Sequence, residues 1–180
     1  MGIGLAQTPP AIFPTTVETG AGRGLERVMT NGFRMTVALP DLAATATLGA
    51  AIAGQLAQGD AVLLQGDLGS GKTTLARAIL TALGVDEAVP SPTFTLVQTY
   101  RAPRLPVSHY DLYRLKRASE MDELGLDEAL SDGAALIEWP ERALNRLPQD
   151  ALTVHLLTDM ERRAAMEGPA RWRGLEAAYV

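Results

Sequence analysis

The hydrophobic pattern of the chain changes its period after the first predicted element. Residues 33–39 alternate between apolar and polar or small side chains, which predicts a half-buried strand. Over residues 42–56 the apolar side chains recur at intervals of three and four, which is the spacing of one helical face. The pair at 59–60, Gly-Asp, follows as a stop signal. The pattern therefore predicts a strand, a helix and a turn, in that order.

The apolar run over residues 61–65 is typical of a parallel strand that is buried on both faces. A helical pattern then continues to Leu83, and Gly84 stands where a left-handed residue commonly ends a helix. The region 158–180 fits a strand and a terminal helix without requiring either. Further strands are predicted at 94–100, 107–111, 134–138 and 152–156, and further helices at 119–130 and 140–147.

Between the strand at 61–65 and the next helix, residues 66–73 read GDLGSGKT, a full match to the phosphate-binding pattern G-x-x-x-x-G-K-[ST]. Glycines allow the backbone to fold into a nest of N–H groups, and the following helix directs its positive end at the same anion. Lys72 can reach the β- and γ-phosphates of a nucleotide, and the Thr73 hydroxyl can bind Mg²⁺. The motif and its strand–loop–helix context predict nucleotide binding.

Alternating strands and helices around such a loop predict an α/β fold, a three-layer P-loop NTPase-like domain with a largely parallel central sheet. Residues 1–32 are rich in Gly, Pro and Thr and show no period, so we expect a disordered leader there. Residues 33–180 are expected to form a single P-loop ATPase domain.

The composition of the chain excludes several kinds of catalytic and metal-binding site. The chain of 180 residues has no cysteine, which excludes thiol catalysis and cysteine-based zinc sites, and its 2 histidines cannot form a histidine-rich metal centre. The net charge of −5 gives no general attraction for nucleic acid, so contact with RNA is expected only through a partner or a local patch. No secretory signal and no bilayer-spanning apolar run is visible, and a cytoplasmic location with no membrane association is expected.

Two acids stand at the predicted ends of strands, where ligands of such sheets bind. Glu138 follows the apolar run at 134–137, and Asp111 ends the short strand predicted at 107–111. One acid would hold Mg²⁺, and the other could orient the attacking water or bind through a metal-bound water. The local pattern does not assign which acid has which role. The turn at 91–95, SPTFT, could sense the γ-phosphate as switch segments do, or could simply begin a strand. His109 shares a strand face with Asp111, and we expect a core or supporting role for it.

The motif set favours adenine over guanine. The Asn-Lys-x-Asp motif that specifies guanine is absent, and no Asp-x-x-Gly follows the phosphate loop at a switch position. We weigh three functions. The first is an Mg²⁺-dependent ATPase; the second is a small-molecule P-loop kinase; the third is a non-catalytic, nucleotide-gated assembly factor.

Four ordered blocks carry a family resemblance. They are GDLGSGKTT at 66–74, SPTFTLV at 91–97, HYDLYRL at 109–115 and IEWP at 137–140. Over residues from about 35 to 157 the chain resembles the bacterial TsaE (formerly YjeE) ATPases of tRNA threonylcarbamoyladenosine synthesis. The resemblance implies a protein that binds ATP and Mg²⁺, hydrolyses ATP slowly by itself, and acts with TsaB and TsaD. That assembly modifies the adenosine next to the anticodon of tRNA, so this chain would meet tRNA only indirectly.

The resemblance also implies roles for single residues. Thr73 and Glu138 would hold Mg²⁺, Lys72 would bind phosphate, and Asp111 would be a required acid near the γ-phosphate. Lys72, Asp111 and Glu138 would thus form the catalytic set.

The remaining residues would contact the nucleotide. Thr45 would lie near the adenine, Thr93 and Thr95 would belong to a switch-like segment, and Trp139 matches the family's tryptophan after the metal acid. Arg163, of the pair Arg162-Arg163, would match a late arginine on the nucleotide side. From the phosphate loop itself the nucleotide would meet Asp67, Leu68, Gly69, Ser70, Gly71, Lys72, Thr73 and Thr74.

Overall fold

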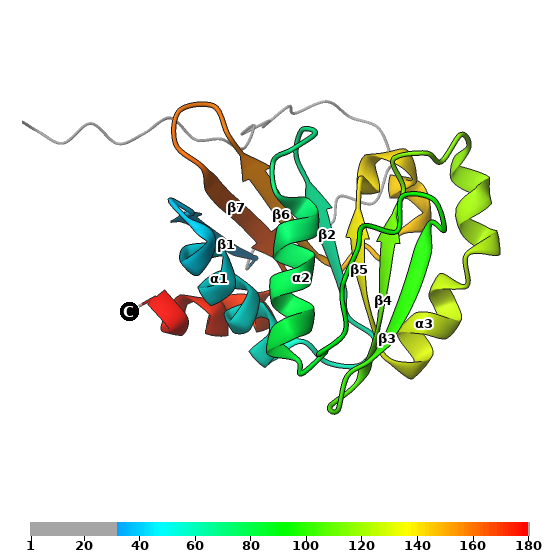
Figure 1. Cartoon of the computed structure of the whole chain (residues 1–180), viewed down its shortest axis with the longest axis horizontal. Coiled ribbons are helices and arrows are strands. Elements are labelled where there is room, and N and C mark those ends of the chain that lie inside the picture. The colour runs from blue at the N-terminus through cyan, green and yellow to red at the C-terminus, as the bar shows by residue number, and fades with distance from the viewer. Residues whose placement is uncertain (1–31, 180) are drawn as a thin grey trace, which may run out of the picture.

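A computed structural model describes residues 32–179, and within this range one mixed sheet of seven strands organises the chain (Figure 1). The strand order across the sheet is β1-β7-β6-β2-β5-β4-β3. The predicted leader at 1–32 lies outside the described residues apart from Gly32. The strands are β1 (Phe33–Ala38), β2 (Ala61–Gln65), β3 (Val97–Arg101), β4 (Pro106–Asp111), β5 (Ala134–Glu138), β6 (Leu152–Leu157) and β7 (Arg163–Gly168). The α-helices are α1 (Leu42–Gln55), α2 (Lys72–Ala82) and α3 (Leu126–Asp132).

The centre of the sheet is parallel and its margins are antiparallel. β2 pairs in parallel with both β5 and β6, and β4 pairs in parallel with β5. β7 runs antiparallel to both β6 and β1, and β3 runs antiparallel to β4. The prediction of an α/β fold with a largely parallel central sheet is confirmed. The parallel strands end at one edge of the sheet, which is where the phosphate loop follows β2.

Alternate side chains of the buried central strand divide the core into two layers. Val62 and Leu64 of β2 pack with the apolar faces of α1 and α2. Ala61 and Leu63 face the other side, where they pack with residues of α3 and of the 3₁₀ segments. In Figure 1, α1 and α2 lie side by side against the sheet, while α3 lies beyond β3 and β4. The result is the predicted three-layer arrangement.

Three predicted elements differ from the structure. The strand predicted from residue 94 begins at Val97, and Phe94 is exposed. The helix predicted over 119–130 is divided into a 3₁₀ segment, Ala118–Glu123, and α3, because Gly125 adopts a left-handed conformation with φ +67°. The helix predicted over 140–147 is two short 3₁₀ segments, Pro140–Arg142 and Leu144–Arg146.

The C-terminal part of the described chain closes the α1 side of the core. The predicted strand is β7, and the terminal helix is a 3₁₀ segment, Ala170–Tyr179, which buries Trp172 and Leu175. Within residues 32–179, none of the helices combines the length and hydropathy that crossing a bilayer requires.

Gly49 allows α1 to pack closely on α2, and this contact gives a stability prediction. A Cβ added at Gly49 would lie 2.6 Å from the Cβ of Ala78, whereas one added at the exposed Gly54 of the same helix would meet nothing within 4 Å. We expect Gly49→Ala to lower the free energy of unfolding by about 1–3 kcal/mol through overpacking. Gly54→Ala should raise it by about 0.5–1 kcal/mol through helix propensity. Urea unfolding of both variants is the measurement, and equal effects of the two substitutions would contradict the close packing.

Candidate functional site

The loop between β2 and α2 adopts a conformation that depends on its glycines. Gly66 has φ +139°, and a Cβ there would lie 2.6 Å from the Leu156 carbonyl oxygen. Gly71, the residue before α2, has φ +104°. A side chain would be strained at both positions. The glycines thus let the chain leave the central strand and begin α2 with its first N–H groups unpaired and available to an anion.

Lys72 is the first residue of α2, and its side chain folds back over the loop. Its Nζ donates hydrogen bonds to the carbonyl oxygens of Gly66, at 2.6 Å, and Asp67, at 2.8 Å. The same ammonium lies 3.8 Å from the centre of the Trp139 ring. Burial lowers the pKa of the Lys72 ammonium, and the nearby carboxylates, Glu138 first among them, oppose this shift. A buried cation is therefore held where the loop would place phosphate.

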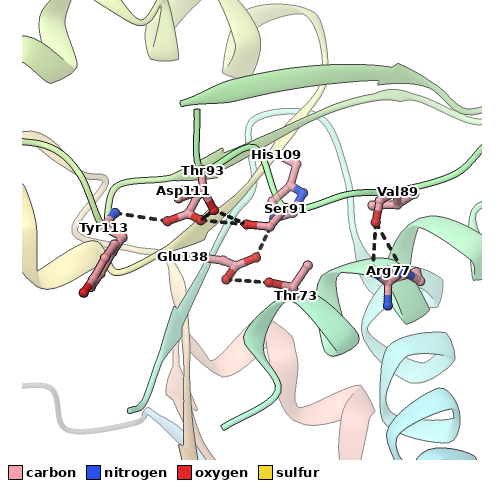
Figure 2. A network of polar contacts seen from close by, with 9 residues as sticks. All are labelled: Thr73, Arg77, Val89, Ser91, Thr93, His109, Asp111, Tyr113 and Glu138. Carbon is pink, nitrogen blue, oxygen red and sulfur yellow. Dashed lines mark hydrogen bonds and ion pairs between the residues drawn. The ribbon is translucent and has the colours of Figure 1, made fainter. Parts of the chain in front are cut away.

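Glu138 ends β5 and is buried against the first turn of α2 (Figure 2). Its Oε2 accepts a hydrogen bond from Thr73 Oγ1 at 3.0 Å, and its Oε1 lies 2.8 Å from Nε2 of His109. The contact joins a residue of α2 to the carboxyl end of a central strand, across 65 positions in the sequence. A carboxylate and a hydroxyl are thus brought together at the first turn of α2.

The donor set at this point fits magnesium. Mg²⁺ prefers oxygen ligands and is usually held by one or two carboxylates, with water and substrate phosphates filling its other positions. Glu138 and Thr73 supply a carboxylate and a hydroxyl in contact with each other. Within the described range, no group of three or more His, Cys, Asp or Glu side chains could hold a metal ion by itself. The arrangement fits a site that substrate phosphates complete.

Asp111 lies beside Glu138 because the two residues are paired in the register of the parallel strands β4 and β5. Its Oδ2 accepts hydrogen bonds from Ser91 Oγ and Thr93 Oγ1, each at 2.7 Å, and its Oδ1 accepts one from the Tyr113 backbone N–H at 3.0 Å. The carboxylate is buried, and Figure 2 shows these donors converging on it. The second acid is therefore fixed by the 91–93 turn.

The turn that holds Asp111 is also attached to α2. The Arg77 guanidinium donates from Nε and Nη2 to the Val89 carbonyl oxygen, at 3.2 and 3.0 Å, two residues before the turn begins. At the other end of the segment, Leu96 takes a left-handed conformation with φ +63°, which is uncommon for a residue with a side chain. The helix that follows the phosphate loop is thus tied to the segment with the candidate switch hydroxyls.

A cavity of about 410 Å³ joins these groups. This volume lies within the range of small-ligand sites. It is lined by Leu68, Gly69, Gly71, Lys72, Thr73, Thr74, Ser91, Thr93, Asp111, Tyr113, Glu138 and Trp139. Most of the predicted site residues therefore surround one space.

The other predicted residues do not line this cavity: Thr45, Asp67, Ser70, Thr95 and Arg163. Asp67 contributes a backbone carbonyl to Lys72, and Ser70 is buried within the loop. Thr45 is buried in α1 and donates to the Asp41 carbonyl oxygen at 3.1 Å. Thr95 is exposed, and Arg163 on β7 forms an ion pair with Asp159 at 2.9 Å. Contacts of these residues with a nucleotide remain predictions from the resemblance.

The structure adds three residues to the predicted set. Ser91 binds Asp111, His109 binds Glu138, and Tyr113 lines the cavity with its ring centre 4.9 Å from that of Trp139. The sequence offers a signal for His109, because alternate residues of a strand share a face and His109 is two positions before Asp111. The partners of Ser91 and Tyr113 depend on contacts distant in sequence, which no local pattern encodes.

Comparison with known proteins identifies the relatives of this architecture. The family model "Threonylcarbamoyl adenosine biosynthesis protein TsaE" matches residues 39–165. A tRNA threonylcarbamoyladenosine biosynthesis protein TsaE from Rickettsia bellii is 46% identical over 115 residues, covering 63% of this chain and 80% of that protein. Its counterpart in Mycobacterium tuberculosis is 42% identical over 131 residues, covering 67% and 77%. Among solved structures, Bacillus subtilis YdiB matches with a TM-score of 0.60 and 30% identity, over 83% of this chain and 95% of that one.

Proposed function

This chain belongs to the TsaE family of tRNA threonylcarbamoyladenosine biosynthesis, and from that premise we propose that it binds ATP with Mg²⁺ and hydrolyses it within the modifying complex. The observation that carries the proposal is the contact between Thr73 and Glu138, which line the same cavity as Lys72 and the phosphate loop. The proposed ATPase domain spans residues 33–180, with 1–32 outside it.

The proposed roles follow from the position and chemistry of each side chain. Lys72 and the loop N–H groups bind the β- and γ-phosphates. Thr73 and Glu138 hold Mg²⁺, which when bound neutralises charge on the phosphate oxygens. Asp111, fixed by its three donors, orients the attacking water toward the γ-phosphate. Lys72 and the loop amides then stabilise the charge that develops on the transferred group.

TsaB- and TsaD-type proteins are the proposed partners. The net charge of −5 supports contact with tRNA through these partners rather than directly. ATP hydrolysis is proposed to reset or license the assembly, and this chain is not proposed to transfer the threonylcarbamoyl group itself.

Turnover is expected to depend on the partners. Among the described residues that line the cavity there is no arginine. An arginine that stabilises the transition state can contribute a factor of about 10³–10⁵, and a partner can supply it. We therefore expect slow phosphate release by the chain alone and a rise of at least about tenfold on adding TsaB and TsaD together. Phosphate release is measured with each partner singly and with the pair, and unchanged turnover with the pair would contradict the proposal.

The cellular test uses tRNA. Depletion of the protein should remove threonylcarbamoyladenosine from the tRNA nucleosides, as measured by mass spectrometry, and expression of the wild-type chain should restore it. Labelled γ-phosphate that appears on a metabolite, instead of as free phosphate, would support the kinase alternative.

A further inference from the structure

His109 is a buried polar side chain at a position where an apolar residue would be expected. It lies on β4 with 0% of its surface exposed, and its neighbours across the sheet are Gln98 on β3 and Leu136 on β5. A buried polar group destabilises a core unless hydrogen bonds compensate it. The single hydrogen bond of this imidazole therefore needs an explanation.

The two ring nitrogens of His109 differ in their hydrogen bonding. Nε2 lies 2.8 Å from Glu138 Oε1, and because a carboxylate oxygen accepts, Nε2 is the donor. Nδ1 is buried with no hydrogen-bond partner among the described residues. A ring that leaves one nitrogen unpaired contributes little to the core. Its specific contribution is the bond to Glu138.

Because of this bond, the two oxygens of the Glu138 carboxylate have different partners. Oε1 is occupied by His109, and Oε2 is the oxygen that contacts Thr73 (Figure 2). The terminal torsion of a glutamate has a broad, roughly two-fold preference, so the chain itself does not fix which way the carboxylate faces. His109 supplies the constraint that the side chain lacks.

We propose that His109 is a positioning residue for Mg²⁺: it fixes the Glu138 carboxylate so that Oε2 is held beside Thr73, ready to bind the ion. The inference rests on the proposed function, because it assumes that Glu138 and Thr73 hold Mg²⁺. Partners that hydrogen-bond to metal ligands commonly change metal affinity about 10- to 100-fold when they are removed.

The test measures ATP binding by calorimetry, first in EDTA and then at increasing MgCl₂ concentrations. His109→Leu should raise the Mg²⁺ concentration at half-saturation about 10- to 100-fold. Its ATP affinity in EDTA should equal that of the wild type, because Lys72 and the loop are untouched. Both measured quantities are binding quantities, so the test does not depend on ATP turnover.

Glutamine and asparagine form a matched pair of variants, because their side chains differ in length by one methylene group. The amide nitrogen of glutamine can occupy the place of Nε2, whereas that of asparagine corresponds to Nδ1 and falls short of Glu138. His109→Gln should therefore keep a near-normal Mg²⁺ requirement, and His109→Asn should behave like His109→Leu. Because both variants are polar and of moderate size, they keep the test valid if the leucine variant does not fold.

A second control separates positioning from general damage to β4. Ser108→Ala removes a buried hydroxyl from the same strand, on the opposite face, where it bonds to Thr99 at 2.9 Å. It should leave the Mg²⁺ requirement unchanged. In a Glu138→Gln background, His109→Leu should add no further loss, because the proposed effect passes through that carboxylate.

The outcomes are distinguishable. If the wild type shows no Mg²⁺-dependent binding of ATP, the proposed function fails and this inference fails with it. If the wild type shows it, and His109→Leu and His109→Asn retain the wild-type Mg²⁺ requirement, only the positioning role of His109 is overturned. An equal loss of ATP affinity in EDTA and in MgCl₂ would also overturn it, because such a loss is a structural effect.

Discussion

Replacing Lys72 with alanine is expected to lower partner-stimulated ATP turnover by about 10²–10³-fold, the range for removing one preorganised charge-stabilising group. The Lys72 ammonium lies at the cavity wall, bonded to two loop carbonyls and 3.8 Å from the Trp139 ring centre. Without it, the loop keeps its N–H groups but loses the only lysine at the site. The measurement is phosphate release in the presence of TsaB and TsaD, together with ATP affinity.

The chain offers a matched control for this variant. Its only other lysine, Lys116, is exposed and does not line the cavity, so Lys116→Ala should retain wild-type turnover. Urea unfolding of Lys72→Ala beside the wild type shows whether the fold is retained, so that a loss of turnover can be assigned to the missing ammonium and not to unfolding. Normal turnover by Lys72→Ala, with restored tRNA modification in depleted cells, would refute the assigned role.

The second large effect is expected for Glu138→Gln, which preserves the shape of the side chain and removes its charge. Mg²⁺-dependent strengthening of ATP binding should disappear, and turnover should fall by about 10²-fold or more. ATP binding in EDTA should be retained or become tighter, because a carboxylate next to Thr73 repels metal-free phosphates. Calorimetry with and without MgCl₂ measures both effects, the lost strengthening of ATP binding by Mg²⁺ and the retained or tighter binding in EDTA.

The control for this variant is Glu123→Gln, which neutralises an exposed carboxylate that does not line the cavity and should change neither quantity. A further comparison concerns the cellular function. If Glu138→Gln binds ATP, releases no phosphate and still supports tRNA modification, the nucleotide-gated assembly factor becomes the better description of this protein.

The parts of the site that could be predicted from the sequence share one physical cause. The phosphate loop is a local motif, and the acids stand at the ends of two strands that the local pattern predicts, Glu138 after an apolar run and Asp111 after a short strand. In the structure, the parallel pairing of β4 with β5 brings these two residues together as partners in the register. The central layer of the fold follows from the same continuous apolar runs.

The parts that could not be predicted depend on contacts between distant segments. The apolar spacing over 119–130 is equally consistent with one helix or with two shorter segments, and the left-handed Gly125 decides between them. The pairing of β1 with β7 joins the two ends of the described chain, and no local pattern specifies it. The hydrogen bond from His109 to Glu138 likewise depends on the packed sheet.

The position of Trp139 has a practical consequence. Its ring lies at the cavity wall, next to the Lys72 ammonium, whereas the only other tryptophan, Trp172, belongs to the C-terminal 3₁₀ segment and is fully buried in the core. Of these two indoles, only that of Trp139 lies where an incoming ligand would alter its surroundings. The unmodified protein therefore contains an intrinsic fluorophore at its own site, and filling of the cavity can be followed by emission, without attaching a dye.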